Sequence, residues 1–495
     1  MRAWIEQNLG RPKGQVPQFP FPEDLYLYDA VIPLVPEFRF AHEPIQSDNS
    51  SRFVGRHYEL RSLVERLLFS EGGSFLVTGY RGVGKTSFVN QVIRELHEAV
   101  PWASTILGDI EILEVQLNVA RPLQPAELMH HIIRRLYDQL RERGVFPLLD
   151  AHIQNELVLA YQRTSFNMTR KMAEVSERSI GLGEASLGTD LLKASLKTSL
   201  VSKKSRSQNY EASFLGYDDK AAEYDIIHLS RRLADGYKEV EGWAWRLRRT
   251  LLRQHRRRTK LKVVFVFDEL DKLEGFTLPR EGKERPVIDE MLAALKNLFT
   301  TSGICFLFVA GKDLQERWLE DLGRGDSVYE SVFSDDKYLP CMWADTDQIC
   351  DNLVDFRAAG ADFGFEPSWS DSPPPGLVRL SPSVTPPPSF GDQPLDTSSG
   401  DYYNKSVYEW FKRYLHFKGR GIPRRVIRGF NEYVRWAEDR PVLAFSRQDV
   451  RRIRFYADLQ SVIDRSEERL FRSGPEEIRG TKQDKRRLGV YYLID

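Results

Sequence analysis

The sequence predicts an α/β fold, in which a parallel β-sheet is covered by helices on both faces and smaller helical parts follow toward the C-terminus. From Ser74 onward, short apolar segments alternate with amphipathic helical segments. Several of these segments are apolar on both faces, which is typical of parallel strands buried between two layers of helices. The chain has 495 residues, enough for about two or three domains.

The expected elements follow one another in strand–helix order. A first helix is expected after Gly55, where Leu60, Leu63 and Leu67 recur at helical spacing. The expected strands cover residues 75–78, 112–119, 262–267, 304–310 and 338–342, and the expected helices cover residues 86–99, 125–143, 238–258, 286–300, 313–322, 402–417 and 423–437. Strands that alternate with helices of this length indicate crossover connections, and therefore a parallel sheet.

Charge and cysteine usage exclude several classes of protein. The 71 acidic and 71 basic residues balance, so net charge gives the chain no general attraction for nucleic acid. Cys305, Cys341 and Cys350 form neither a disulfide framework nor a CxxC metal pattern. No apolar run approaches the roughly 20 residues that span a bilayer, and the N-terminus lacks the apolar segment of a secretory signal. We therefore expect a cytoplasmic protein that does not contact membranes.

The run Gly79-Tyr80-Arg81-Gly82-Val83-Gly84-Lys85-Thr86 matches the pattern G-x-x-x-x-G-K-[ST] at every fixed position. It stands between an expected strand and an expected helix, so the N–H groups of the loop and of the first helical turn, as far as Ser87, converge on phosphate oxygens. We expect Lys85 to contact the β- and γ-phosphates and the Thr86 hydroxyl to bind Mg²⁺. The alternative, a chance match in a glycine-containing turn, is disfavoured by this context. The motif predicts ATP and Mg²⁺ as ligands.

A second motif ends the apolar strand at residues 262–267, which is followed directly by Asp268 and Glu269. The carboxyl ends of parallel strands meet at one edge of the sheet, so both acids are expected beside the phosphate-binding loop. Asp268 would hold Mg²⁺ through its water shell, and Glu269 would orient and deprotonate the attacking water. The alternative is a solvated acidic turn, which nearby Asp271 keeps open.

With both motifs in this order, residues 52–434, apart from two insertions within them, resemble the AAA+ and STAND branch of P-loop ATPases, including the origin-recognition type. The run Phe53-Val54-Gly55-Arg56 resembles the family box that lines the adenine pocket, which assigns Val54 and Gly55 to nucleotide binding. Leu339-Pro340 resembles the entry to the helical lid of this family. Gly421-Ile422-Pro423-Arg424 resembles the G-x-P-R element of that lid, so Pro423 and Arg424 would reach the nucleotide, with Arg424 on the γ-phosphate.

Two further positions follow from the resemblance. Arg324 is placed like an arginine finger, which one subunit supplies to the site of its neighbour; the alternatives are a solvated loop arginine here and an exposed helix arginine at Arg424. Where the family has Asn, Ser or Thr after the fourth strand, this chain has Ala310-Gly311-Lys312. Either Lys312 replaces that residue, or hydrolysis is slow and the protein acts as a switch.

The resemblance also divides the chain into parts. Residues 1–50 are expected to form an extended arm, and residues 51–345 a P-loop ATPase core with an insertion at about 150–220. Residues 346–440 would form the helical lid, interrupted by a proline-rich linker at residues 366–400 that we expect to be disordered. Residues 441–495 would form a basic tail, either helical or, by analogy with the family, a winged helix.

Three functions fit these features. The resemblance implies a slow, regulated ATPase that acts as a nucleotide-dependent switch or assembly factor, for example in signalling or defence. It also implies a homo-oligomer when ATP is bound, with a protein partner or effector that is unknown. Basic patches at residues 246–262 and 447–487 keep open a nucleic-acid loader or a transposition-type regulator. The departure at residues 310–312 keeps open an ATP-binding scaffold with little turnover.

Overall fold

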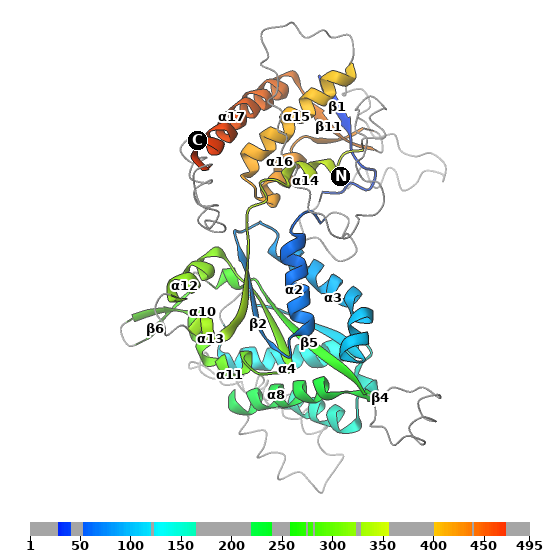
Figure 1. Ribbon diagram of the computed structural model, residues 1–495, viewed down its shortest axis with the longest axis vertical. Helices are drawn as coiled ribbons and strands as arrows, with labels where there is room; N and C mark the ends of the chain where they lie inside the picture. The colour runs from blue at the N-terminus through cyan, green and yellow to red at the C-terminus, as the bar shows by residue number, and fades with distance from the viewer. Residues whose placement is uncertain are drawn as a thin grey trace, which may run out of the picture. The chain divides into compact units, whose positions relative to one another are not determined.

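The computed structural model describes residues 28–40, 53–119, 123–164, 219–239, 258–273, 276–280, 283–322, 328–355, 400–437 and 440–471. They form two compact units (Figure 1). One unit comprises residues 45–81 and 85–339, and the other comprises residues 1–44, 82–84 and 340–495. We call them the sheet unit and the terminal unit. Most of the insertion predicted at about 150–220 and most of the linker predicted at 366–400 lie outside the described residues.

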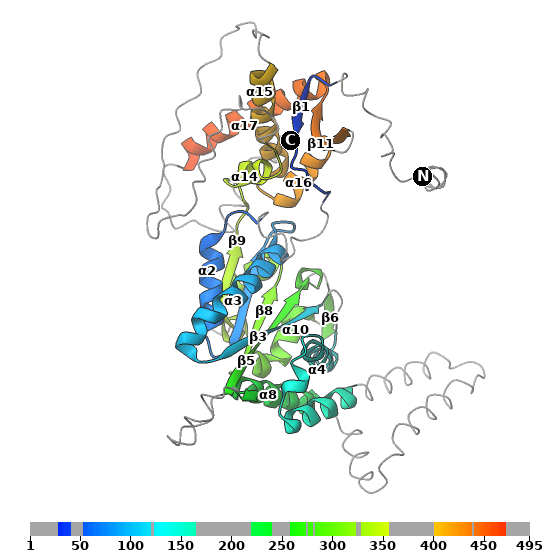
Figure 2. The ribbon, with the colours of Figure 1, turned by 90° about the vertical axis from the view of Figure 1, so that its right-hand side faces the viewer.

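The sheet unit is built on a parallel sheet, as predicted. In the described part of the chain its strand order is β3 (Ile110–Asn118), β5 (Arg258–Asp268), β8 (Ile304–Val309), β2 (Gly73–Gly79) and β9 (Phe333–Leu339), all parallel. The short strand β4 (Lys238–Glu239) pairs antiparallel with β5. Strands β2, β5 and β8 are therefore central, and their carboxyl ends share one edge of the sheet (Figure 2).

Helices cover both faces of this sheet. Helices α2 (His57–Phe69) and α3 (Lys85–Leu107) lie on one face, as Figure 2 shows. The other face carries α4 (Pro125–Glu142), α8 (Asp219–Asp235), α10 (Val287–Ala294), α11 (Lys296–Phe299), α12 (Lys312–Leu322) and α13 (Val328–Val332). Smaller elements are η3 (Phe146–Leu148), η4 (Leu270–Lys272), the hairpin of β6 (Thr277–Arg280) and β7 (Lys283–Pro286), and a helical stretch over residues 151–164.

A cluster of buried aromatic rings fixes the centre of the sheet. Phe267 at the end of β5 stacks on Phe308 of β8, with ring centroids 4.9 Å apart. Phe299 packs edge-on against Phe306 and Phe308 at 5.1 and 4.9 Å. All four side chains are fully buried, and burying a Phe side chain stabilises a fold by about 1.5–3 kcal/mol. The cluster therefore fixes the strand ends from which the polar residues emerge.

Several predicted boundaries are wrong. The strand expected at residues 338–342 is β9, which begins at Phe333 and stops before Pro340, because proline lacks the N–H that a further ladder bond requires. The single helix expected over residues 286–300 is broken at Leu295, whose φ of −105° and ψ of 11° are not helical. In the range 238–258, where a helix was expected, the first two residues form β4 and the last residue begins β5. The residues between them, 240–257, lie outside the described part.

The terminal unit combines helices with a small antiparallel sheet. Its helices are α14 (Thr346–Asp351), α15 (Gly400–Gly419), α16 (Pro423–Asn431) and α17 (Arg447–Phe471). Strand β1 (Ala30–Pro33) pairs with β11 (Arg440–Phe445), which also pairs with β10 (Val434–Ala437). The helix expected over residues 423–437 therefore ends at Asn431, and β10 follows it. None of the described helices has the length and apolar character needed to cross a membrane.

Candidate functional site

The phosphate-binding loop joins β2 to α3. Strand β2 is buried along its whole length and delivers the chain to Gly79 at the carboxyl edge of the sheet. Gly82 and Gly84 have φ values of +86° and +96°, a region in which a side chain would be strained, so glycine suits both positions. Helix α3 begins directly afterwards and has no acidic residue in its first turn. Its N–H groups and its dipole are therefore available to an anion.

Lys85 is held against the loop that precedes it. Its side chain is only 8% exposed, and its Nζ donates to the carbonyl oxygens of Gly79 at 3.0 Å and of Tyr80 at 3.4 Å. Carbonyl oxygens compensate part of the cost of burying an ammonium group. The arrangement places a fixed positive charge inside the curve of the loop.

The two residues predicted to hold the metal come together. Asp268 is the last residue of β5, opposite Asn118 of β3, and its carboxylate is hydrogen-bonded to the Thr86 side chain. The backbone N–H of Glu269 also donates to Asp268 Oδ1 at 2.7 Å. Burial raises the pKa of Asp268, and both hydrogen bonds oppose that rise. A half-buried acid and a hydroxyl from two different elements thus face the same point.

These two side chains fit Mg²⁺. The described residues contain no group of three or more His, Cys, Asp and Glu side chains that could form an all-protein metal cage. Mg²⁺ is usually held by one or two protein oxygens together with phosphate oxygens and waters, so it does not need such a cage. Thr86 and Asp268 supply that small set beside the phosphate-binding loop.

Glu269 has an unusual backbone conformation and a cationic partner. Its φ is +66°, and its Oε1 lies 2.6 Å from Lys272 Nζ. The hydrogen bond from Lys272 lowers the pKa of Glu269 most, burial opposes the shift, and hydrogen bonding to Asn118 and the charge of Arg81 lower the pKa further. The carboxylate is therefore ionised at neutral pH, as a base must be, while Lys272 and Asn118 hold it.

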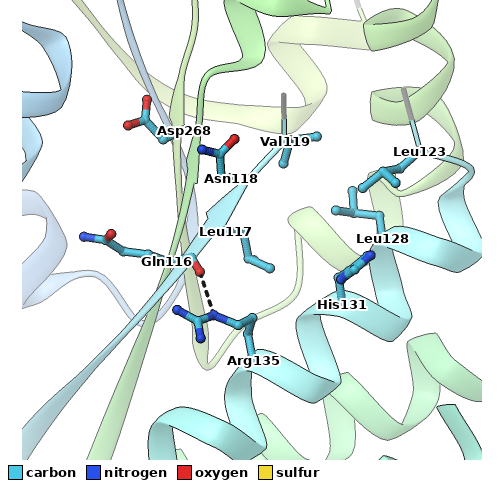
Figure 3. Close-up of a pocket in the computed structure, with 9 residues that line it drawn as sticks. All are labelled: Gln116, Leu117, Asn118, Val119, Leu123, Leu128, His131, Arg135 and Asp268. Carbon is cyan, nitrogen blue, oxygen red and sulfur yellow. Dashed lines mark hydrogen bonds between the residues drawn. The ribbon is translucent and has the colours of Figure 1, made fainter. Parts of the chain in front are cut away.

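A cavity of about 420 Å³ lies beside Asp268, between β3 and α4. Figure 3 shows its lining residues, with Asp268 and Asn118 close together at the strand ends. Arg135 of α4 donates from Nε to the carbonyl oxygen of Gln116 at 3.3 Å. The sequence pattern missed Asn118 and this cavity, because both depend on the pairing of β3 with β5, which a motif of consecutive residues does not contain.

The remaining predicted site residues are placed as follows. Val54 is buried just before α2, Gly55 has a φ of +69°, Val83 is buried in the loop, and Ser87 lies in the first turn of α3. In the terminal unit, Pro423 is the first residue of α16, and Arg424 follows it with an exposed side chain. Arg324 lies outside the described residues. The structure thus brings together residues 79–87, 268 and 269, and it leaves the roles of Arg324 and Arg424 as predictions.

The predicted basic patches are only partly described, since residues 246–257 and 472–487 lie outside the described part. Lys262 belongs to the structure of the fold rather than to a surface patch. Its Nζ donates to the carbonyl oxygens of Leu68 at 2.9 Å and Ser70 at 2.6 Å, at the C-terminal end of α2. A lysine there compensates the unsatisfied carbonyls of the helix end.

Comparisons with known proteins show what this chain is similar to. A family model for the AAA ATPase domain matches residues 52–301. No curated protein matched the chain. Among solved structures, the chain is similar to a Walker-type ATPase of Pyrococcus abyssi, with 13% identity, a TM-score of 0.29 and coverage of 63% of this chain and 60% of that one. The chain thus spans less than two thirds of that protein's length.

It is also similar to the ORC2 protein of Aeropyrum pernix. In its ADPNP–ADP complexes that protein is 11% identical, with a TM-score of 0.33 and coverage of 87% of this chain and 73% of that one. In its ADP form it is 11% identical, with a TM-score of 0.31 and coverage of 93% and 88%.

The family match covers about half of the chain and includes both motifs at the strand ends. It confirms the predicted resemblance to the AAA+ ATPases. This chain belongs to the AAA ATPase domain family.

Proposed function

We propose that this chain binds Mg-ATP where β2, β5 and α3 meet, hydrolyses it slowly in the cytoplasm, and acts as a nucleotide-dependent switch or assembly factor. The observation that carries the proposal is the hydrogen bond between the side chains of Thr86 and Asp268. Thr86 directly follows Lys85, which is buried. A hydroxyl and an ammonium group from the start of α3 meet a carboxylate from the end of β5 beside a glycine-rich loop. That combination suits a metal-bound triphosphate.

Each residue has a defined part in this proposal. Lys85 and the N–H groups of residues 79–87 bind the phosphates, and Val54 and Gly55 line the adenine pocket. Mg²⁺ held by Thr86 and Asp268 would neutralise charge on the β- and γ-phosphates. Glu269 orients the attacking water and accepts its proton.

Slow turnover is supported by the contacts of Glu269. Its carboxylate is engaged by Lys272 at 2.6 Å and by Asn118, and both contacts compete with a water for the same oxygens. A carboxylate that is paired with these side chains for most of the time is less often available to a water, so the rate of hydrolysis is lower. The same contacts support a switch, in which the bound nucleotide persists long enough to be recognised by a partner.

The switch would work through the γ-phosphate, which ATP has and ADP lacks. In this proposal Arg424 contacts the γ-phosphate, so that ATP and ADP favour different positions of the terminal unit. Arg324 would complete the site of a neighbouring subunit in an ATP-bound homo-oligomer. Size measurements with ADP and with a non-hydrolysable ATP analogue test this assembly, and a monomer in both would remove Arg324 from it.

Two substitutions test the nucleotide site. Lys85→Ala should weaken nucleotide binding at least about tenfold, because it removes a charged hydrogen bond to phosphate worth about 1.5–3 kcal/mol. Glu269→Gln should leave binding intact and reduce phosphate release by about 10²-fold or more. The measurements are titration with a fluorescent ATP analogue and steady-state phosphate release, with unfolding temperatures as the control for folding. Undiminished affinity in folded Lys85→Ala would refute the proposed site. Equal rates of phosphate release in wild type and Glu269→Gln would refute Glu269 as the base, and the absence of release from both would favour an ATP-binding scaffold.

One observation favours a second function, the loading of nucleic acid. Arg447, Arg451 and Arg454 are exposed on successive turns of α17, and exposed Phe455 lies beside them. Basic side chains spaced along one helix face suit a phosphate backbone, and an exposed aromatic ring suits base stacking. Binding of single- and double-stranded DNA measured across a salt series decides between the two, since a steep loss with salt supports this function and no binding removes it.

A further inference from the structure

The cavity between β3 and α4 has the dimensions of a small-molecule site. Its volume of about 420 Å³ falls within the roughly 300–1,000 Å³ that such sites enclose. Every described residue that lines it belongs to the sheet unit, and residues 79–87 are not among them. Asp268 is part of its wall, so an occupant would lie beside the proposed metal site without entering the phosphate-binding loop. The cavity therefore has room for a second ligand next to the nucleotide.

One side of the cavity is apolar. Leu117 comes from β3, Leu128 comes from α4, and Leu123 lies just before that helix (Figure 3). Leu117 and Leu128 are buried and Leu123 is half-buried. A wall of three leucines suits a hydrocarbon or aromatic group, because removing apolar surface from water is favourable.

Arg135 supplies a positive charge at the end of the cavity opposite Asp268, as Figure 3 shows. Its side chain is half-buried, and its Nε donates to the carbonyl oxygen of Gln116 at 3.3 Å. This bond anchors the guanidinium group on β3, the outermost strand of the described sheet. None of the described acidic side chains forms an ion pair with Arg135. The other N–H groups of a guanidinium form a planar fork that matches a carboxylate or a phosphate.

The neighbours of Arg135 are compatible with an anion. His131 stands one turn earlier on α4 and lines the same cavity, so it adds a second polar side chain on that face of the helix. The carboxylate in the wall, that of Asp268, accepts hydrogen bonds from Thr86 and from the N–H of Glu269. These donors offset part of its charge, and it lies at the far end from the guanidinium group.

We infer that this cavity binds a small organic anion as an effector, with the carboxylate or phosphate group on Arg135 and the apolar part against the three leucines. The inference goes beyond the proposed function, because it concerns a ligand other than the nucleotide. Asp268 belongs both to the cavity wall and to the proposed metal site. Binding of the anion should therefore change the affinity for the nucleotide, and the nucleotide should change the affinity for the anion by the same factor.

The test uses three naphthalene probes that differ only in their polar group, namely naphthoate, naphthyl phosphate and uncharged naphthol. By isothermal titration calorimetry, we expect at least one of the two anions to bind the full chain about tenfold or more tightly than naphthol does, the gain expected for one charged hydrogen bond. The anion that binds identifies the group that the site takes. Arg135→Met keeps the length of the side chain and should reduce the affinity for that anion to that for naphthol, whereas Arg135→Lys should retain most of it. Arg134→Met is the matched control, since Arg134 lies over the ring of Tyr161 instead.

The outcomes separate the cavity from the nucleotide site. Equal affinity for all three probes, no binding of any, or anion binding that Arg135→Met leaves unchanged would overturn the inference. Anion binding that is lost in Lys85→Ala and kept in Arg135→Met would place the anion in the phosphate-binding loop, and would also overturn it. If Arg135→Met does not fold, Leu123→Trp decides: the larger ring occupies the apolar side, so weaker anion binding supports the inference and unchanged binding refutes it.

Titration of ADP with and without the bound anion tests the role as effector. We expect the affinity for ADP to change about fivefold or more, and an unchanged affinity would refute that role. A wild type that binds the anion through Arg135 but binds no nucleotide would refute the proposed function and leave the cavity as a binding site.

Discussion

At the scale of single residues, the candidate site contrasts charges that are fixed with charges that can exchange partners. Lys85 is buried on carbonyl oxygens, and Asp268 is held by Thr86 and by the N–H that follows it. Glu269 pairs instead with Lys272, whose side chain is 45% exposed. Exposed pairs contribute only about 0–1 kcal/mol, so they rearrange at little cost. The residues proposed to bind phosphate and metal are thus more rigid than the residue proposed to act on water.

His97 on α3 gives a residue-scale prediction for stability. Burial lowers its pKa most, the charge of Arg143 lowers it further, and Glu114 opposes the shift. Its Nε2 is buried with no hydrogen-bond partner among the described residues. The unfolded chain therefore binds a proton here at a higher pH than the folded one does. Stability should decline as the pH falls below the ordinary His pKa of about 6.5.

The measurement is urea unfolding at pH 7.5 and 5.5. His97→Gln should lose less stability than the wild type between these two pH values, because glutamine does not titrate. His152→Gln is the matched control, since the His152 side chain is 68% exposed. The same loss in wild type and His97→Gln would show that His97 does not contribute to the pH dependence.

Consecutive residues made the core of the site predictable. Gly79 to Thr86 and the acid pair after β5 were identified because each motif is contiguous, and the structure brings Thr86 to Asp268 as the parallel sheet requires. Asn118 was missed because its place opposite Asp268 depends on strand register. The contact of Lys312, at the start of α12, with Tyr80 of the phosphate-binding loop likewise joins residues that lie far apart in the sequence.

At the scale of elements, β8 is the strand on which the sheet depends most. It pairs with β5 and β2 at once, and each of its six residues is buried. Phe306→Ala should therefore destabilise the sheet unit by about 3–5 kcal/mol, the usual cost of removing a buried Phe side chain. The measurement is the free energy of unfolding by denaturant. Phe276→Ala is the matched control, because that ring is 47% exposed and its loss should cost less than about 0.5 kcal/mol.

Burial explains which elements could be predicted. The central strands β2, β5 and β8 are apolar on both faces, so their sequences alone identify them. Strand β9 is an edge strand that contains Asp335, Asp336 and Lys337, and only its apolar C-terminal end was recognised. Strand β10 follows α16 after two residues, and its short sequence Val434–Ala437 continues the apolar pattern of the helix. Edge and short strands lack the periodicity on which prediction depends.

At the scale of the whole molecule, each of the two units is built from segments that are not contiguous in the sequence. Strand β1, near the N-terminus, pairs with β11, so residues from both ends of the described chain form one sheet. We expected an extended arm there from the sequence, because four apolar residues do not identify a partner strand about four hundred residues away. Only the pairing itself contains that information.

The pairing of β1 with β11 gives a prediction for the molecule. Ile32 is fully buried opposite Leu443, and neighbouring Val31 is half-buried on the alternate face. Ile32→Asp places a charge in this core and should unfold the terminal unit selectively, because an unpaired buried charge is strongly destabilising. Limited proteolysis read by mass spectrometry should show early cleavage within residues 400–471 and a protected sheet unit. Val31→Asp should be much milder, and equal cleavage in both variants would contradict this role for β1.

The same pairing determines when the terminal unit can fold during protein synthesis. The ribosome synthesises β1 about four hundred residues before its partner strand β11, an interval of roughly 20–80 s at 5–20 residues per second. Throughout that interval the apolar side chains of β1 have left the exit tunnel without the strand that covers them. Nascent chains of this protein should therefore recruit chaperones at β1, and the terminal unit should fold only after β11 has been synthesised.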